Sequence, residues 1–581
     1  MPYLIPDTSL DNQKSKKVRW AIIALLALVF ITFLTLQTSL LSPFFSSTPS
    51  GVHLADVTAG SNLEEYRRAR IYADNPAYIE VMGGGVAIGD VDGDGWEDLF
   101  FAGMPTLDPD LQPDPSPSAL FRNQGDGTFR EITDEAGLDD IQGFPMGALF
   151  FDFNNNGRQD LYVTSYDGGQ LFRNDGGTFT DVTDPAGVAL DGLCGELPCL
   201  AAAASAADYD RDGFLDLLIV NNVGWDISNP GHYGRDALLP FLFEGQRSIL
   251  FRNNGDGTFS DVTGESGIRN FEDSQSRTAG KGLSSVWTDI NRDGWPDLYI
   301  ANDMSPSRLY LNRSDGTFSE IGRAAGVDEI KSSMGVDAAD YNLDGHFDLV
   351  VTNLVDLMTT LYRNRGDLRF DNNTIQSGLL LSGRSSGWGI LFSDLDLDGF
   401  PDLVMGSGQI WNEPDEAENL FFRNRGNGTF EDVTSTLDIQ PNDQITRGLA
   451  VLDLNRSGKP DLIFSNIDGS APQLLENRSS GNHWLRVDLE GVNSNRNAVG
   501  ATVILEREDG HTRQQMVKAG NSYVSSGSKS LFFGLGSSAV HTLTIQWPSG
   551  QTDTLEAAGI KNKILRIREG EGVIEGGIEN R

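Results

Sequence analysis

The sequence predicts an all-β protein: a seven-bladed β-propeller and a small β-sandwich-like domain, preceded by one N-terminal transmembrane helix. Three observations support this prediction. An Asp-rich segment recurs seven times between apolar runs of strand length, roughly 50 to 80 residues apart. Residues 483–570 alternate apolar and polar side chains in short runs separated by turns, which is typical of a small antiparallel β-domain. Residues 20–41 form the one long apolar stretch.

The composition excludes some classes of protein. The 581 residues include 44 Lys and Arg against 83 Asp and Glu, a formal net charge of −39. Such a chain does not bind nucleic acid through its overall field, because phosphate binding needs a basic surface. Hydrophobic residues make up 39% of the chain, which is enough to form folded cores rather than a disordered chain.

The N-terminus predicts export across a membrane. Residues 1–19 carry Lys14, Lys16, Lys17 and Arg19 immediately before the apolar segment 20–41, which is long enough to span a bilayer. Positive residues stay cytoplasmic, so we expect a single-pass anchor with a linker over 42–51 and the bulk of the chain periplasmic or extracellular. The alternative is a cleaved signal peptide followed by secretion.

Each repeat contains three elements in a fixed order. The Asp loop is followed by a segment such as LFRN, at Leu120 in the first unit, and then by TFxDVT or a close variant, as at Thr258. Each unit therefore has room for four strands. The last unit lacks the final element, but residues 53–58 supply one before the first loop. A closed ring over 52–480, completed by that N-terminal strand, leaves no sheet edge exposed.

The Asp loops predict calcium sites. In most loops the residues at positions 1, 3, 5 and 9 are Asp or Asn, and position 6 is Gly, which permits the positive φ of a tight turn. Six to eight hard oxygen ligands suit Ca²⁺, so up to seven ions are expected. Single Asp-Gly pairs are ordinary hairpin turns, but seven copies in one register favour metal. The predicted ligands are Asp90, Asp92, Asp94 and Asp98; Asp152, Asn154, Asn156 and Asp160; Asp208, Asp210, Asp212 and Asp216; Asp289, Asn291, Asp293 and Asp297; Asp340, Asn342, Asp344 and Asp348; Asp394, Asp396, Asp398 and Asp402; and Asp453, Asn455, Ser457 and Asp461.

The seven loops differ in carboxylate content. Those headed by Asp90, Asp208 and Asp394 contain four carboxylates each at these positions, whereas those headed by Asp152 and Asp453 contain two. Fewer carboxylates weaken the affinity for calcium, so the Asp152 and Asp453 loops are expected to be the poorest sites.

The long insertions predict a ligand face opposite the calcium loops. Strand parity places 101–119, 221–249 and 405–418 there, and elaborated loops on a rigid scaffold often bind ligands. The candidate ligand residues are Trp225, His232, Tyr233, Arg235 and Trp411, although they could instead pack the insertions onto the ring. In an exported chain Cys194 and Cys199, the only cysteines, predict a local disulfide.

Motifs in both parts of the chain resemble a known family. NHWLRVDLEGVNSNRNAVGATV (482–503), LFFGLG (531–536) and IQWPSG (545–550) resemble the ASPIC/UnbV domain, assigned to 481–570 with a tail over 571–581. The Asp-loop units resemble FG-GAP/VCBS propeller repeats, as in integrin α-chain heads. The combination is similar to the cartilage acidic protein family and its bacterial relatives. The resemblance implies a calcium-binding extracellular protein.

Three classes of function remain open at the level of sequence. The first is a non-enzymatic binding or adhesion protein that recognises a protein or glycan ligand. The second is an extracytoplasmic enzyme or accessory protein acting on polysaccharide. The six His residues are scattered, and no G-x-S-x-G or H-E-x-x-H motif occurs, so the binding protein is favoured. A third possibility is a scaffold that recruits a partner through the C-terminal domain.

Overall fold

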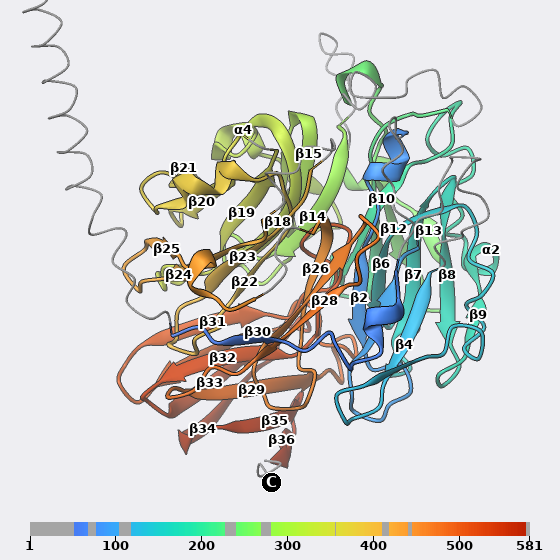
Figure 1. Ribbon diagram of the computed structural model, residues 1–581. Coiled ribbons are helices and arrows are strands. Elements are labelled where there is room, and N and C mark those ends of the chain that lie inside the picture. The colour runs from blue at the N-terminus through green and yellow to red at the C-terminus, as the bar shows by residue number, and fades with distance from the viewer. Residues whose placement is uncertain are drawn as a thin grey trace, which may run out of the picture. The chain divides into compact units, whose positions relative to one another are not determined.

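The computed structural model describes residues 51–67, 77–103, 118–226, 240–268, 280–354, 356–409, 418–439 and 444–576. Gly51–Arg581 forms one compact unit, and its described parts consist of β-strands with only short helices (Figure 1). The predicted segments 1–19 and 20–41 lie outside the described residues, as does the linker up to residue 50. Within the described ranges, no helix is long and apolar enough to cross a membrane.

The first three repeats form separate four-stranded antiparallel sheets. In each, the Asp loop joins the first strand to the second. The strands are β2 (Val86–Gly89), β3 (Asp98–Phe101), β4 (Ala119–Asn123) and β5 (Phe129–Glu131); β6 (Phe144–Phe151), β7 (Asp160–Tyr166), β8 (Gly168–Asn174) and β9 (Phe179–Asp181); and β10 (Ala201–Ala207), β11 (Asp216–Asn221), β12 (Ile249–Asn253) and β13 (Phe259–Asp261).

The fourth and fifth repeats are joined into one eight-stranded sheet. The second strand of the fourth repeat is long, and its end pairs with the first strand of the fifth, for example Asp303 with Ser332. The strands are β14 (Gly282–Thr288), β15 (Asp297–Pro306), β16 (Arg308–Asn312), β17 (Phe318–Glu320), β18 (Ile330–Ala339), β19 (Asp348–Asn353), β20 (Thr360–Asn364) and β21 (Phe370–Asn372). The sixth repeat contains β22 (Gly387–Ser393), β23 (Asp402–Ser407), β24 (Leu420–Asn424) and β25 (Phe430–Asp432).

The last repeat takes its fourth strand from the N-terminal end of the unit. Strand β1 (Leu54–Asp56) pairs antiparallel with β28 (Gln473–Asn477), with Leu54 opposite Asn477. The other strands of this sheet are β26 (Thr446–Leu452) and β27 (Asp461–Asn466). The pairing predicted for residues 53–58 is therefore confirmed in its central residues.

The inner strands are apolar because both of their faces are covered. In β11 the side chains of Leu217, Leu218, Ile219 and Val220 are all fully buried. Leu217 and Ile219 belong to one hydrophobic cluster, whereas Leu218 and Val220 belong to another. Successive residues of a strand face opposite ways. Alternate side chains of β11 therefore pack into the hydrophobic clusters on its two opposite faces. The short helices lie in the connections: η2 (Leu63–Glu65), η3 (Tyr78–Val81), α2 (Thr183–Ala186), η6 (Pro240–Leu242), α3 (Thr263–Ser266), α4 (Gly322–Ala325), η7 (Leu379–Arg384) and η8 (Thr434–Thr436).

The C-terminal domain consists of two four-stranded sheets. One is ordered β32 (Leu531–Gly536), β29 (His483–Glu490), β35 (Lys563–Arg568) and β36 (Gly572–Gly576). The other is ordered β31 (Thr512–Met516), β30 (Thr502–Arg507), β33 (Val540–Gln546) and β34 (Thr552–Ile560). The prediction of purely antiparallel pairing is wrong in one place: β29 and β35 run parallel, because the intervening strands return the chain to the same end of the sheet.

One segment of the C-terminal domain lies between the sheets of the repeats. We call residues 517–530, between β31 and β32, the axial segment. It forms isolated bridges to the first strands of three repeats: Ala519 to Ala206, Ser522 to Val336 and Ser526 to Ala87. Tyr523 is fully buried, donates its hydroxyl to the carbonyl of Met82 and packs edge-on against Trp388. The axial segment therefore lies among the innermost strands.

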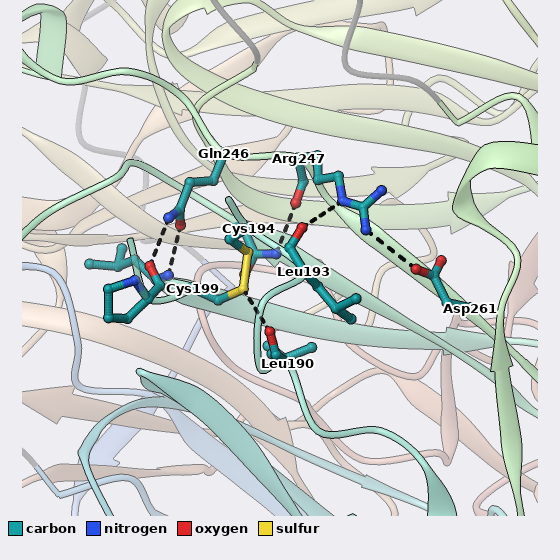
Figure 2. Close-up of a disulfide and its surroundings, with 10 residues drawn as sticks. Leu190, Leu193, Cys194, Cys199, Gln246, Arg247 and Asp261 are labelled. Atoms are coloured by element: carbon teal, nitrogen blue, oxygen red, sulfur yellow. Dashed lines mark hydrogen bonds and ion pairs between the residues drawn. A yellow bond between two sulfur atoms is a disulfide. The ribbon is translucent and has the colours of Figure 1, made fainter. Parts of the chain in front are cut away.

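The disulfide predicted between Cys194 and Cys199 is present in the connection between β9 and β10 (Figure 2). Gln246 fastens this connection to the next sheet: its amide donates to the Pro198 carbonyl at 2.7 Å and accepts from the Leu200 N–H at 2.8 Å. Arg247 donates to the Leu193 carbonyl at 2.8 Å. The disulfide and these side chains hold a connection that has no regular secondary structure over 188–199.

Candidate metal centres

Each Asp loop is folded around its first aspartate. In the first loop Asp90 accepts the N–H groups of Gly93 at 2.8 Å and Gly95 at 2.9 Å. The bond from the position-6 glycine N–H to the first aspartate recurs in all seven loops. Gly95 has a φ of 86°, a conformation that is strained for other residues. The backbone thus fixes one carboxylate at the centre of every loop.

The ninth residue is a buried aspartate that ties the loop to the sheet. Asp98 accepts the N–H of Val91 at 3.0 Å and of Asn123 at 2.8 Å, and the other six repeats contain the same pair of bonds. Burial raises the pKa of Asp98 and of Asp160 to about 8. A cation held nearby would favour the charged form of these groups.

Among the described residues, three loops gather three carboxylates whose oxygens lie within 4.8 Å of one another. They are Asp90, Asp92 and Asp94; Asp208, Asp210 and Asp216; and Asp394, Asp396 and Asp402. These clusters fall in the loops for which the sequence predicts four carboxylates. In the loops headed by Asp152, Asp289 and Asp340, an Asn side chain donates to a carboxylate instead, as Asn291 does to Asp293 at 2.8 Å.

The Asp208 loop fits a cation best. The buried Oδ1 atoms of Asp208 and Asp210 accept no hydrogen bond, and no ion pair reaches either side chain within the described residues. Burial, followed by the charges of Asp212 and Asp210, raises the pKa of Asp208 to about 7. Buried carboxylate oxygens without a donor are costly, and a divalent cation would satisfy them.

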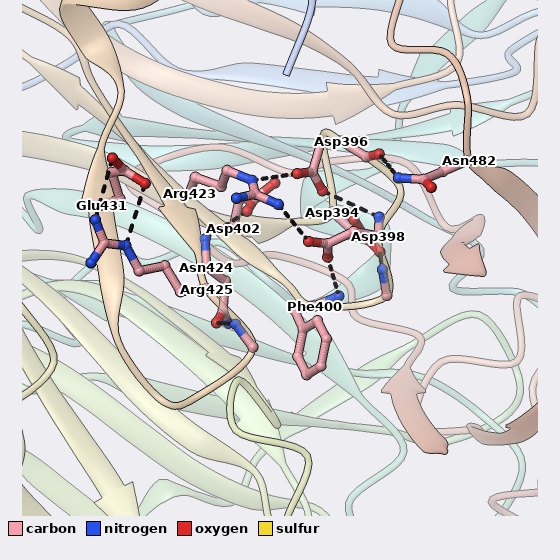
Figure 3. Close-up of polar contacts among 12 residues, drawn as sticks. Asp394, Asp396, Asp398, Phe400, Asp402, Arg423, Asn424, Arg425, Glu431 and Asn482 are labelled. Atoms are coloured by element: carbon pink, nitrogen blue, oxygen red, sulfur yellow. Dashed lines mark hydrogen bonds and ion pairs between the residues drawn. The ribbon is translucent and has the colours of Figure 1, made fainter. Parts of the chain in front are cut away.

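The Asp394 loop combines an unpartnered oxygen with arginine contacts (Figure 3). Asp394 Oδ1 is buried and accepts no hydrogen bond, whereas its Oδ2 pairs with Arg513 of β31 at 2.6 Å. Arg423 pairs with Asp396 at 2.5 Å and with Asp398 at 3.0 Å. In the first loop Arg122 similarly pairs with Asp92 at 2.6 Å and Asp94 at 3.1 Å. These guanidinium groups neutralise part of the charge available to a cation.

The Asp453 loop does not fit a calcium ion. Its two carboxylates, Asp453 and Asp461, accept the same backbone N–H groups as their equivalents in the other loops, but positions 3 and 5 are Asn455 and Ser457 and add no carboxylate. In addition, Arg486 of β29 donates to Asp453 Oδ2 at 2.8 Å, with 9% of the arginine side chain and none of the aspartate side chain exposed. A guanidinium from the C-terminal domain therefore supplies the positive charge in this loop.

Replacing Arg486 tests this assignment. We expect Arg486→Gln to destabilise the chain by about 3–5 kcal/mol, because it leaves Asp453 buried without its cation. The matched control is Arg478→Gln, which removes an exposed pair with Glu476 and is expected to cost about 0–1 kcal/mol. Urea unfolding compares the two variants, and equal destabilisation would contradict a special role for Arg486.

The predicted ligand face is only partly described. Trp225 is buried, with 2% exposure, and packs edge-on against Tyr166, whose hydroxyl donates to the Trp225 carbonyl. His232, Tyr233, Arg235 and Trp411 lie outside the described residues. The C-terminal domain, in contrast, contacts the Asp-loop face, through Arg486 and Arg513.

The asparagine of the LFRN element has a structural role that was not predicted from the sequence. This residue ends the third strand of every repeat, and its Nδ2 donates at 2.7 to 3.0 Å to the carbonyl of the second loop residue in another repeat. Asn253, for example, donates to Phe153. The recurrence of Asn in all seven copies was the available signal, because a buried amide needs partners at both ends.

These sheets and loops define a repeat protein of propeller-like, all-β fold. The family model for the FG-GAP-like repeat matches residues 90–163, 152–219, 289–351 and 410–464, and that for ASPIC and UnbV matches 491–574. The chain is thus an FG-GAP-repeat protein with a C-terminal ASPIC and UnbV domain, homologous to cartilage acidic protein 1. It is 27% identical to the Homo sapiens protein over 525 residues, which cover 85% of this chain and 73% of the relative. Identity to the Xenopus tropicalis protein is 25%, with 85% and 74% covered.

The solved structures compared are more distant. An Agrocybe aegerita lectin specific for non-reducing terminal N-acetylglucosamine aligns with a TM-score of 0.38 and 18% identity, over 67% of this chain and 87% of the lectin. BBS1N in complex with ARL6DN aligns with a TM-score of 0.40 and 12% identity, over 71% of this chain and 99% of BBS1N. At these scores the alignments carry no inference about function.

Proposed function

We propose that this chain is a calcium-binding, non-enzymatic binding or adhesion protein displayed on the outer side of a membrane. The observation that carries the proposal is the pair of buried, unpartnered carboxylate oxygens on Asp208 and Asp210. Asp208, Asp210 and Asp216 would hold the ion, and Ca²⁺ would supply the positive charge that these oxygens lack. Homology to cartilage acidic protein 1 is consistent with this role.

Direct calcium titration of the full chain in detergent tests the proposal. We expect the double variant Asp208→Asn/Asp210→Asn to bind one calcium ion fewer than the unmodified chain, because amides cannot supply the lost charge. Asp191→Asn is the control, since Asp191 is exposed in a connecting segment. Unchanged stoichiometry in the double variant would exclude this loop as a site.

We further propose that the seven repeats close into a seven-bladed propeller. The support is the asparagine series: six of the bonds link a repeat to the one before it, and Asn123 of the first repeat donates to Leu454 of the last at 3.0 Å. With β1 completing the last sheet, each repeat then has two neighbours.

Alanine substitution at Asn123 tests ring closure. In a closed ring, Asn123→Ala should destabilise the chain as much as Asn253→Ala, by about 3 kcal/mol, because each leaves buried carbonyls without donors. In an open array Asn123 would have no partner in the last repeat, so Asn123→Ala would cost clearly less than Asn253→Ala. Thermal unfolding of the two variants distinguishes these outcomes.

The proposed location rests on residues 20–41 and on the disulfide, which is typical of oxidising compartments. The N-terminal segment would anchor the chain, with its basic residues in the cytoplasm. A ligand on the outer side would be a protein or a glycan, and nucleic acid is not a proposed partner.

A further inference from the structure

A cavity of about 790 Å³ lies between the Asp-loop face and the C-terminal domain. Its lining includes Asp90 and Asp92 of the first loop, Arg158 of the second loop and Arg456 of the last loop, together with Asp488 of β29 and Arg566 of β35. Sites for small ligands occupy roughly 300–1,000 Å³. The cavity is therefore large enough for an oligosaccharide of a few units.

The wall of this cavity is rich in positive charge compared with the rest of the chain. It contains five cationic side chains and five acidic ones, whereas the whole sequence contains 44 and 83. Two of the five acids, Asp90 and Asp92, belong to a predicted calcium loop. With that loop loaded, the lining would have a net positive charge.

Two of the guanidinium groups are free to bind a ligand. Within the described residues, the side chains of Arg158 and Arg456 make no hydrogen bond or ion pair. Arg456 lies over the ring of Trp96, 5.6 Å from its centroid, which orients the group without using its donors. Lys529, which also lines the cavity, donates to Ser526 at 3.2 Å and to the Gly527 carbonyl at 3.3 Å.

The remaining lining residues favour a hydroxylated ligand over an aromatic one. Ser530 donates to Asp488 Oδ1 at 2.6 Å, and Asn497 Oδ1 accepts the Asp152 N–H at 3.0 Å. The Oδ2 of Asp488 and the Nδ2 of Asn497 can exchange hydrogen bonds with hydroxyls. The described lining residues include no aromatic ring, so a base or an aromatic peptide side chain would have nothing on which to stack.

We propose that this cavity binds an acidic oligosaccharide, with sugar carboxylates paired to Arg158 and Arg456. Guanidinium groups bind carboxylates through paired, charge-assisted hydrogen bonds. The chain as a whole repels polyanions through its charge of −39, so recognition depends on this local excess of cations. The inference rests on the proposed function, because loading of the first loop completes the positive lining.

Titration with trigalacturonate, a trisaccharide with three carboxylates, tests the proposal on the full chain in detergent with 1 mM CaCl₂. Binding is expected for the unmodified chain and for Arg313→Gln, an exposed control on the fourth repeat that lies outside the lining. Arg158→Gln/Arg456→Gln should bind about tenfold more weakly or worse, with an unchanged melting temperature. Galactotriose, the uncharged trisaccharide, should not bind.

Three results would overturn the proposal: no binding of trigalacturonate at 10 mM, equal binding of galactotriose, or full affinity in the double arginine variant. A calcium titration without sugar is performed on the same samples. Calcium binding without oligosaccharide binding removes the cavity inference alone, whereas absence of calcium binding removes the proposed function itself.

Discussion

Removal of calcium is expected to lower the melting temperature of the full chain by about 7 °C. A site held at a hundredfold excess of calcium over its dissociation constant contributes about 2.7 kcal/mol, so three such sites contribute about 8 kcal/mol. An unfolding entropy near 2.1 cal/mol/K per residue gives about 1.1 kcal/mol/K for the folded unit, which converts that energy into this shift. Calorimetry in 1 mM CaCl₂ and in excess EGTA measures it.

The loop variants separate a specific effect from a general one. Asp208→Asn/Asp210→Asn should melt closer to its EGTA value even with calcium present, because one of the three clustered sites is lost. Asp191→Asn should keep the whole shift. If EGTA leaves the melting temperature of the unmodified chain unchanged, calcium does not stabilise this fold.

Substitutions at the contact between the axial segment and the inner strands are expected to lower the stability of the fold strongly. A Cβ added to Gly85 would lie 2.0 Å from the carbonyl oxygen of Val524, so Gly85→Ala must displace the segment or the strand end beside it. We expect a loss of about 3 kcal/mol, at the upper end of overpacking costs. Tyr523→Ala should cost about 3–5 kcal/mol, since it removes a fully buried ring.

The control for this prediction is Gly264→Ala. A Cβ added to Gly264 would meet no atom within 4 Å, and the φ of this residue is not positive, so alanine should be tolerated there. Thermal unfolding followed by tryptophan fluorescence compares the variants. If Gly85→Ala melts like Gly264→Ala, the axial segment does not occupy the space between the inner strands.

Local features of the sequence predicted the repeats well. The register of Asp90 and its equivalents marked each turn, and the surplus element at residues 53–58 indicated the pairing of β1 with β28. The ranking of the loops by carboxylate number also agrees with the clusters headed by Asp90, Asp208 and Asp394. These features depend on residues close together in the chain.

Contacts between distant residues could not be predicted in the same way. Arg486 and Asp453 are 33 positions apart, and Arg513 and Asp394 are 119 apart; nothing in their local sequence pairs them. The axial segment is rich in small and polar residues and has neither strand nor helix periodicity. Its burial depends on the space that the repeat sheets leave between them, which the local sequence does not show. The charge that Arg486 supplies to the Asp453 loop is therefore visible only in the structure.

We propose that clustered carboxylates in the Asp loops hold calcium. An anomalous difference map from crystals grown with calcium tests it most directly. We predict a peak among Asp208, Asp210 and Asp216, and none beside Asp453, where Arg486 supplies the charge. A map with no peak in the Asp208 loop at saturating calcium would show that this loop does not hold the ion.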